Sequence, residues 1–194
     1  MNEKVKVFEK ELEYINNPRY KKSCEVLISN LPDYFFEVEA SSTGKYHPSF
    51  TLGTGGLVRH TKAAVRIAKE FYNSESITGG YTNNEKDLMI VALLLHDGLK
   101  SGKEKSRYTK FEHPLLVCDY IKENKEILEF TDKEIEFLIS VISSHMGPWN
   151  ESNYSNVILP KPASSHQRFV HMCDFLASRK FIDIKFDENN NTME

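Results

Sequence analysis

The segment from Leu88 to Leu95 constrains the fold of this chain more than any other, because it is apolar without interruption. A helix that is apolar on every side has to be buried at the centre of a domain, and a buried strand is the alternative for a run of this length. Because polar and apolar residues do not alternate here, we favour the helix. The run ends at His96 and Asp97, and an ionised carboxylate at the edge of an apolar core is costly unless a cation or hydrogen-bond donors compensate it.

Helical spacing of apolar residues predicts further, amphipathic helices at about residues 3–15, 18–31, 57–72, 113–127, 132–146 and 164–180. The segments between them are rich in glycine and polar residues, which favours loops at 32–56, 98–112 and 147–163. No pair of strands is predicted. We therefore expect an all-α bundle of roughly six to nine helices, and the polar residues considered below place a buried metal site at its centre.

Chain length limits the number of domains. A chain of 194 residues can bury one sizeable core but is short for two, so a single domain over residues 1–194 is expected. The hydrophobic share of 40% and the charged share of 27% are typical of globular proteins and argue against wholesale disorder. The polar end of the chain, residues 187–194, is expected to be a flexible tail.

Several classes of protein are disfavoured by the composition. No apolar run approaches the roughly 20 residues of a membrane span, and the N-terminus is charged where a signal peptide would be apolar, so we expect a cytoplasmic protein with no membrane partner. Cys24, Cys118 and Cys173 are widely spaced, which favours neither a disulfide framework nor a thiolate zinc site. The net charge of -3 gives no global field that would favour nucleic acid.

Polar side chains that can bind metals recur on the apolar faces of the predicted helices. Helical spacing places His60, His113, His145 and Asp174 each on a stripe with apolar residues, so each faces inward. A single inward histidine is more often a hydrogen-bonded core residue than a ligand. Together with His96 and Asp97, however, these groups come from five helices, and each needs a partner when it is buried. One metal centre would satisfy all of them.

The order of His60, His96-Asp97 and Asp174 resembles the HD superfamily of metal-dependent phosphohydrolases. Segment 55–60 (GGLVRH) is similar to the first-helix signature of the family, segment 93–100 (LLLHDGLK) to its apolar-HDxGK motif, and segment 171–178 (HMCDFLAS) to its closing Asp helix. His113 and His145 fall where the dinuclear members carry two extra histidines. The resemblance covers a motif-bearing core of about residues 47–180, preceded by the helices within 3–31.

The chain departs from the family pattern at two places. The family usually has glycine two positions after the aspartate, whereas here Gly98 comes first and Leu99 second, although Lys100 keeps the expected offset. A pair of histidines is common in the fifth motif, and here Ser144 precedes His145. We expect metal ligation to be retained, with a different turn after Asp97 and one contact to substrate or to a ligand missing beside His145.

The resemblance implies a centre with one or two divalent transition metal ions. One ion would be held by His60, His96, Asp97 and Asp174, and Asp97 would bridge to a second, held by His113 and His145. In the implied mechanism a metal-bound hydroxide attacks phosphorus in line, with Asp97 and Lys100 as catalytic residues and no side-chain nucleophile. Ligation by imidazoles and carboxylates favours Mn, Fe, Co, Ni or Zn over Mg.

Five residues are candidates for binding the substrate: Lys100, Arg107, Arg59, Trp149 and His47. Lys100 and Arg107 belong to a basic loop that could hold phosphate, and an aromatic side chain such as Trp149 can stack on a nucleobase. The competing interpretation is a solvated charged loop for the basic residues other than Lys100, and ordinary packing for Trp149 and His47.

Three functions are compatible with these motifs. The first is hydrolysis of a phosphate ester in a nucleotide or a short single-stranded oligonucleotide, since parts of the chain look similar to the HD-domain 3'-to-5' exonuclease branch, although there is no room for its usual nucleic-acid-binding domain. The second is an HD-type mixed-valent diiron oxygenase, since the ligand set of such enzymes resembles the one in this chain. The third is a non-catalytic HD sensor or interaction module, which typically loses ligands. No protein partner is predicted.

Overall fold

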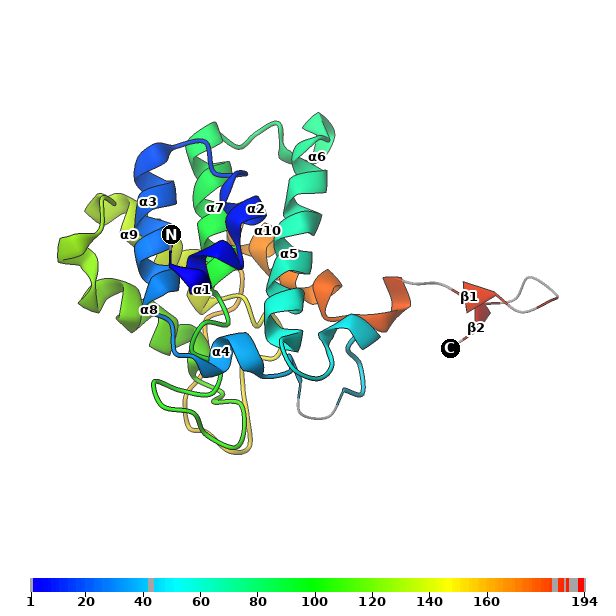
Figure 1. The fold of residues 1–194 in the computed structure, drawn as a ribbon. Coiled ribbons are helices and arrows are strands. Elements are labelled where there is room, and N and C mark those ends of the chain that lie inside the picture. The colour runs from blue at the N-terminus through cyan, green and yellow to red at the C-terminus, as the bar shows by residue number, and fades with distance from the viewer. Residues whose placement is uncertain (1, 42–43, 183–184, 187, 189–191, 194) are drawn as a thin grey trace.

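The computed structural model describes residues 2–41, 44–182, 185–186, 188 and 192–193. Six long helices make up the body of the molecule (Figure 1): α3 (Pro18–Ser29), α5 (Gly56–Tyr72), α7 (Asn83–Leu95), α8 (His113–Glu123), α9 (Asp132–Ser143) and α10 (Ser165–Ala177). Single-turn helices accompany them: α1 (Glu3–Lys6), α2 (Glu9–Leu12), α4 (Tyr34–Glu37) and α6 (Glu75–Thr78). Short 3-10 turns are η1 (Ser49–Thr51), η2 (Lys125–Ile127) and η3 (Lys180–Ile182). The prediction of an all-α bundle is confirmed.

Helix α7 lies at the centre of the bundle, where it packs against α3, α5, α9 and α10. Every residue from Leu88 to Leu95 is buried, as expected for a helix that is apolar on all sides. Its N-terminus is capped by Thr82, whose hydroxyl accepts from the backbone N–H of Glu85 while the Glu85 carboxylate accepts from the backbone N–H of Thr82. The position of this helix brings His96 and Asp97 to the middle of the molecule.

The helices around α7 begin where the sequence offers capping residues. Thr131 with Glu134 and Ser164 with Gln167 form capping boxes at the starts of α9 and α10. Helix α5 begins instead at Gly56, where a Cβ atom would lie 2.0 Å from the backbone oxygen of Thr51. Only glycine therefore allows the loop before α5 to pack this closely against the helix that carries His60.

The N-terminal segment differs from the prediction of one helix over residues 3–15. It forms two single turns, α1 and α2, because the backbone leaves the helical region at Phe8 (φ -109°, ψ 18°). The Phe8 ring is fully buried against Phe35 and Phe36. The chain then binds to α7 through the buried carboxylate of Asp87, which accepts from the backbone N–H groups of Asn16 and Asn17. The N-terminal segment thus shares the hydrophobic core of the long helices.

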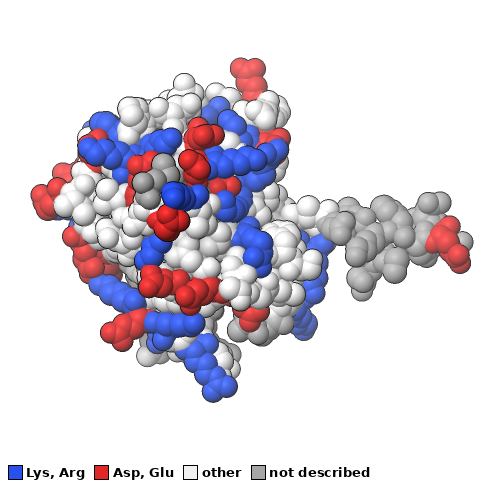
Figure 2. Space-filling model, in the orientation of Figure 1, with Lys and Arg blue, Asp and Glu red and all other residues white. Residues whose placement is uncertain are grey.

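Near the C-terminal end of the described residues lies a pair of antiparallel two-residue strands, β1 (Lys185–Phe186) and β2 (Thr192–Met193), and an isolated bridge joins Ser152 and Ser155 in the loop before α10. The flexible tail predicted for residues 187–194 falls largely outside the described residues. On the face drawn in Figure 2, acidic and basic side chains are interspersed, which agrees with the small net charge. Among the described residues, no helix has the length and apolar character needed to cross a membrane.

Candidate metal centre

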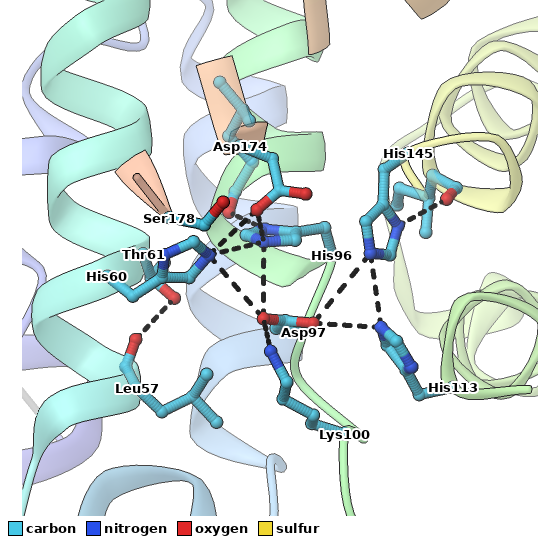
Figure 3. Close-up of polar contacts among 12 residues, drawn as sticks. Leu57, His60, Thr61, His96, Asp97, Lys100, His113, His145, Asp174 and Ser178 are labelled. Atoms are coloured by element: carbon cyan, nitrogen blue, oxygen red, sulfur yellow. Dashed lines mark hydrogen bonds and ion pairs between the residues drawn. The ribbon is translucent and has the colours of Figure 1, made fainter. Parts of the chain in front are cut away.

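The ends of the long helices bring the six predicted ligands together in one place (Figure 3). Two lie at the C-terminal end of α7, one in the second turn of α5, one at the first residue of α8, one just after α9 and one in the last turn of α10: His96, Asp97, His60, His113, His145 and Asp174. All are buried except Asp174, whose side chain is 17% exposed. Gly98 permits the tight packing that follows Asp97, because a Cβ there would lie 2.8 Å from the Leu31 side chain.

The carboxylate of Asp97 divides the centre into two halves. Its Oδ2 atom faces one pair of imidazoles, at 3.7 Å from His60 Nε2 and 3.6 Å from His96 Nε2. Its Oδ1 atom faces the other pair, at 3.0 Å from His113 Nε2 and 3.9 Å from His145 Nε2. Figure 3 shows Asp97 between the two pairs. A carboxylate in this position can bind one cation with each oxygen.

Asp174 completes the half that contains His60 and His96. Its Oδ1 atom lies 2.9 Å from His60 Nε2 and 3.4 Å from His96 Nε2. The two imidazole nitrogens are 3.4 Å apart. In the other half, His113 Nε2 and His145 Nε2 are 3.2 Å apart. Each half therefore presents a pair of imidazole nitrogens together with carboxylate oxygen.

Backbone carbonyls fix the orientation of three of the imidazoles. Nδ1 of His96 donates to Leu93 O (2.7 Å), Nδ1 of His113 to Lys110 O (2.8 Å) and Nδ1 of His145 to Ile142 O (2.8 Å). Since a carbonyl oxygen only accepts, Nδ1 carries the proton and the Nε2 lone pair of the neutral ring points into the centre. This is the arrangement that metal-ligating histidines adopt. Nδ1 of His60 is buried without a partner among the described residues.

Both carboxyl groups of the centre are held in the ionised form. Burial opposes ionisation of Asp97, but the ammonium group of Lys100 and the imidazoles of His96 and His113 keep its pKa well below the usual range. Burial likewise opposes ionisation of Asp174, and hydrogen bonds from His60 and His96 keep its pKa well below the usual range. The centre thus concentrates negative charge in the protein interior.

The histidines respond differently to this charge. Burial disfavours the protonated form of His96, but the carboxylates of Asp97 and Asp174 outweigh burial and raise its pKa. Burial and the neighbouring His96 lower the pKa of His145 to about 3, so His145 is neutral at physiological pH. The raised pKa of His96 means that a metal ion would compete with a proton for its imidazole.

The donor set fits a metal ion. Ligand atoms lie within 4.8 Å of one another in three overlapping groups: His60, His96 and Asp97; His96, His145 and Asp174; and Asp97, His113 and His145. Imidazole nitrogens that face each other need a proton or a cation between them, and two buried carboxylates need compensation by positive charge. The buried His and Asp groups could therefore hold a metal ion, and borderline N and O ligands suit first-row transition metals.

A cavity of about 740 Å³ gives access to the centre. Its inner part is lined by His60, Asp97, His145 and Asp174, whereas His113 is not part of the lining. Three of the five predicted substrate contacts line it as well: His47, Lys100 and Trp149. Burial, followed by Lys100 and His60, lowers the pKa of His47 to about 4, so its imidazole enters the cavity as a neutral group.

The other two predicted substrate contacts lie outside the cavity lining. The Arg59 guanidinium donates to the carbonyl groups of Phe50, Leu52 and Thr54, and thereby holds the loop before α5. Arg107 lies over the ring of Tyr108, 5.3 Å from its centroid. The structure thus places Arg59 in a structural role and does not bring Arg107 to the centre.

Other residues of the cavity were not predicted from the sequence: Tyr46, Met146, His171, Phe175, Ser178, Arg179 and Phe181. Phe175 and Ser178 follow Asp174 on α10 or just beyond it, so their proximity to a ligand was the available signal. His171 supports the centre, because its Nδ1 donates to the carbonyl of His145 at 2.7 Å. Nothing in the local sequence indicated that Tyr46 and Arg179 would meet.

Comparison of the chain with protein-family models, with curated proteins and with solved structures found no match.

Proposed function

We propose that this protein is an HD-type metal-dependent phosphohydrolase that cleaves a phosphate ester of a nucleotide or a short oligonucleotide. The observation that carries the proposal is the division of four imidazoles between the two oxygens of Asp97, with His60 and His96 on Oδ2 and His113 and His145 on Oδ1. A carboxylate that bridges two imidazole-rich halves suits a two-metal site for displacement at phosphorus.

Each half of the centre has its own ligands under this proposal. The first ion would be held by His60, His96, Asp97 and Asp174, and the second by Asp97, His113 and His145. When bound, such a pair of divalent cations lowers the pKa of a water molecule for attack on phosphorus and offsets the charge that develops on the phosphoryl oxygens.

Lys100 is the side chain of the cavity best placed to bind the phosphoryl group. It is the third residue after Asp97, its side chain is 16% exposed, and it lines the cavity beside the buried ligands. Its ammonium group provides three donors and a point charge, which suits a phosphate oxygen. We expect Lys100 to orient the substrate and to stabilise negative charge during the reaction.

The experiment is a metal analysis followed by a substrate panel. The purified protein is loaded in turn with Mn, Co, Ni or Mg and assayed on nucleoside mono- and triphosphates, cyclic dinucleotides and short oligoribonucleotides. We expect retained transition metal and metal-dependent phosphate-ester cleavage of at least one class, which Asp97→Ala abolishes. Asp119→Ala is the matched control, because Asp119 is an exposed carboxylate of α8 that pairs with Lys122 on the surface.

Two outcomes would overturn the proposal. Metal-dependent oxygen consumption without cleavage of any phosphate ester would indicate the mixed-valent diiron oxygenase, for which the same ligands would serve. A protein that retains no transition metal and cleaves nothing would indicate a non-catalytic module.

A further inference from the structure

One wall of the cavity beside the metal centre is aromatic. The Trp149 and Phe175 rings are stacked, with centroids 5.7 Å apart and planes inclined by 14°. Phe181 lies against Phe175 at 6.1 Å, and Tyr46 adds a further ring to the lining. Trp149 is 47% exposed, Phe181 58% and Tyr46 56%. Large apolar rings that gather uncovered at one cavity mark a place where a ligand binds.

Two cations lie at this wall: Lys45, whose Nζ atom is 5.1 Å from the ring centroid of Tyr46 alone, and Arg179, which contacts three of the rings. The Arg179 guanidinium carbon lies 4.5 Å from the ring centroid of Phe175, 4.7 Å from that of Trp149 and 5.8 Å from that of Tyr46. These contacts hold the guanidinium group in place through cation-π attraction. We call Tyr46, Trp149, Phe175, Arg179 and Phe181 the aromatic wall.

The N–H donors of Arg179 make no hydrogen bonds within the described part of the chain. Among the described residues no carboxylate pairs with its guanidinium group and no acceptor receives a hydrogen bond from it, and its Nε atom is buried without a partner. Arginine is always charged and carries N–H donors in a fixed fork that matches the oxygens of a phosphate group. A guanidinium group that is fixed by aromatic rings and has no polar partner in the described part of the chain is preorganised for an anionic ligand.

The cavity thus offers two different surfaces to one ligand. Its inner part carries the imidazoles and carboxylates of the centre together with Lys100, whereas the aromatic wall carries flat apolar rings and Arg179. A phosphorylated sugar or polyol would use the inner part but has no planar face for the rings. A nucleotide has both an anionic group and a planar base, and bases of any sequence stack on aromatic side chains.

We infer that the aromatic wall is a nucleoside-binding subsite, in which the substrate base stacks on the exposed rings of Trp149 and Phe181 and Arg179 binds the phosphate chain of the same nucleotide. This inference rests on the proposed function and deepens it, because it assigns the base and its phosphate to residues that do not belong to the metal centre. It concerns binding alone, so it can be tested without turnover.

Trp149 makes the test direct, because it is the only tryptophan of the chain. Its fluorescence is recorded while metal-free, chelator-treated protein is titrated with AMP, adenosine or ribose 5-phosphate. We expect saturable quenching by AMP and by adenosine, with AMP the tighter ligand, and no quenching by ribose 5-phosphate. Quenching by ribose 5-phosphate equal to that by AMP, or none by either AMP or adenosine, would overturn the inference.

Arg179→Met separates charge from packing, because methionine keeps an unbranched apolar chain without the guanidinium group. We expect AMP to bind at least about tenfold more weakly and adenosine to bind as before, since a charge-assisted hydrogen bond contributes on the order of 1.4 kcal/mol or more. Arg168→Met is the matched control, since Arg168 lies on α10, the helix that precedes Arg179, is exposed and donates to Ala163 O away from the cavity. Equal losses for AMP and adenosine in Arg179→Met would mean that Arg179 only shapes the wall, and would overturn its role.

The inference and the proposed function can fail separately. Nucleotide hydrolysis without Trp149 quenching would reject the aromatic wall and leave the phosphohydrolase in place. Quenching with the expected ligand order, but no hydrolysis with any metal, would support the subsite and reject the phosphohydrolase.

Discussion

The ammonium group of Lys100 lies 2.6 Å from Oδ2 of Asp97, the same carboxylate oxygen that faces His60 and His96. Asp97 is buried, with its side chain 2% exposed, so its charge needs a cation close by. Lys100 supplies that cation when no metal is present. A metal ion on the same oxygen would take over this role and would leave the ammonium group free to turn toward the cavity.

Replacement of Lys100 by methionine should therefore destabilise the metal-free protein without weakening its binding of metal. We expect the metal-free protein to lose at least about 1 kcal/mol of unfolding free energy, because a buried charge loses its nearest partner. Metal affinity should be retained or increased, because a competing cation has been removed. Urea unfolding in the presence of a chelator measures the change in stability, and titration with metal measures the change in affinity.

The control for Lys100 is Lys103→Met. Lys103 belongs to the same loop, but its ammonium group pairs with Glu123 on the surface, where ion pairs contribute little. Its replacement should change neither property. Loss of metal from Lys100→Met would show that Lys100 supports the ligands rather than competing with the metal.

Removal of Asp97 should affect both halves of the centre. We expect Asp97→Ala to abolish binding of both ions, because each half uses one of its oxygens. His113→Ala should spare the half formed by His60, His96 and Asp174, and so lower the metal content rather than abolish it. Elemental analysis of the purified variants gives the stoichiometry, and equal metal content in Asp97→Ala and the parent protein would reject the assignment.

Replacement of Gly147 by alanine should disturb the hydrogen bond by which His171 supports the metal centre. The Gly147 φ of +61° is unfavourable for other residues, and a Cβ there would lie 2.2 Å from the His171 ring. His171 in turn binds the carbonyl of His145. We expect Gly147→Ala to lower the unfolding free energy by about 3 kcal/mol or more, through strain and displacement of the ring, and to weaken binding of the ion held by His145.

Gly53→Ala provides the comparison for Gly147. Gly53 has a similar φ of +69°, but a Cβ there would meet nothing within 4 Å. It should therefore show the backbone strain alone, about 1–2 kcal/mol, and leave metal binding unchanged. Equal stabilities of the two variants in urea unfolding would show that the His171 ring moves aside without cost.

Glu134 should contribute to the acid sensitivity of the fold. Burial opposes its ionisation, but hydrogen bonds from Tyr20, from the backbone of Thr131 and from Arg19 lower its pKa from 4.5 to about 2. A carboxyl group whose pKa is lower in the folded state stabilises the fold above its unfolded pKa, and this contribution is lost as the pH falls from about 4.5 toward 2. Glu134→Gln should therefore flatten the fall in stability over this range.

Urea unfolding at neutral pH and near pH 3 measures that slope. The matched control is Glu136→Gln, an exposed position on the same helix, which should keep the steep dependence of the parent protein. The same slope in Glu134→Gln as in the parent would show that other carboxyl groups dominate acid unfolding.

The helices could be predicted because burial in a bundle imposes a simple period on the sequence. The segment from Leu88 to Leu95 is apolar all round and lies at the centre, and each remaining long helix begins within two residues of its predicted start. The break at Phe8 could not be predicted, because its spacing from Val5 and Leu12 suits one continuous helix. The ring turns out of that helix into a pocket formed by Phe35 and Phe36, which depends on tertiary packing.

The ligands could be predicted for a related reason. Histidines and aspartates at inward positions are rare enough to stand out, and helical spacing shows that they face inward. The aromatic wall has no such signature, because Phe175 on the face of α10 is also an ordinary core residue. Its partners Tyr46 and Arg179 are far apart in the sequence, and they meet because Lys180 N donates to Tyr46 O at 3.1 Å.

The carbonyl groups that hold His96, His113 and His145 all belong to the residue three positions earlier in the chain. The orientation of each ring is therefore fixed by a single turn of its own backbone and does not require a particular neighbouring side chain. Such a centre should withstand extensive exchange of the side chains around it. It should fail when one residue is inserted or deleted in any of these turns, because that shift would rotate an imidazole away from the ion while the rest of the fold stayed intact.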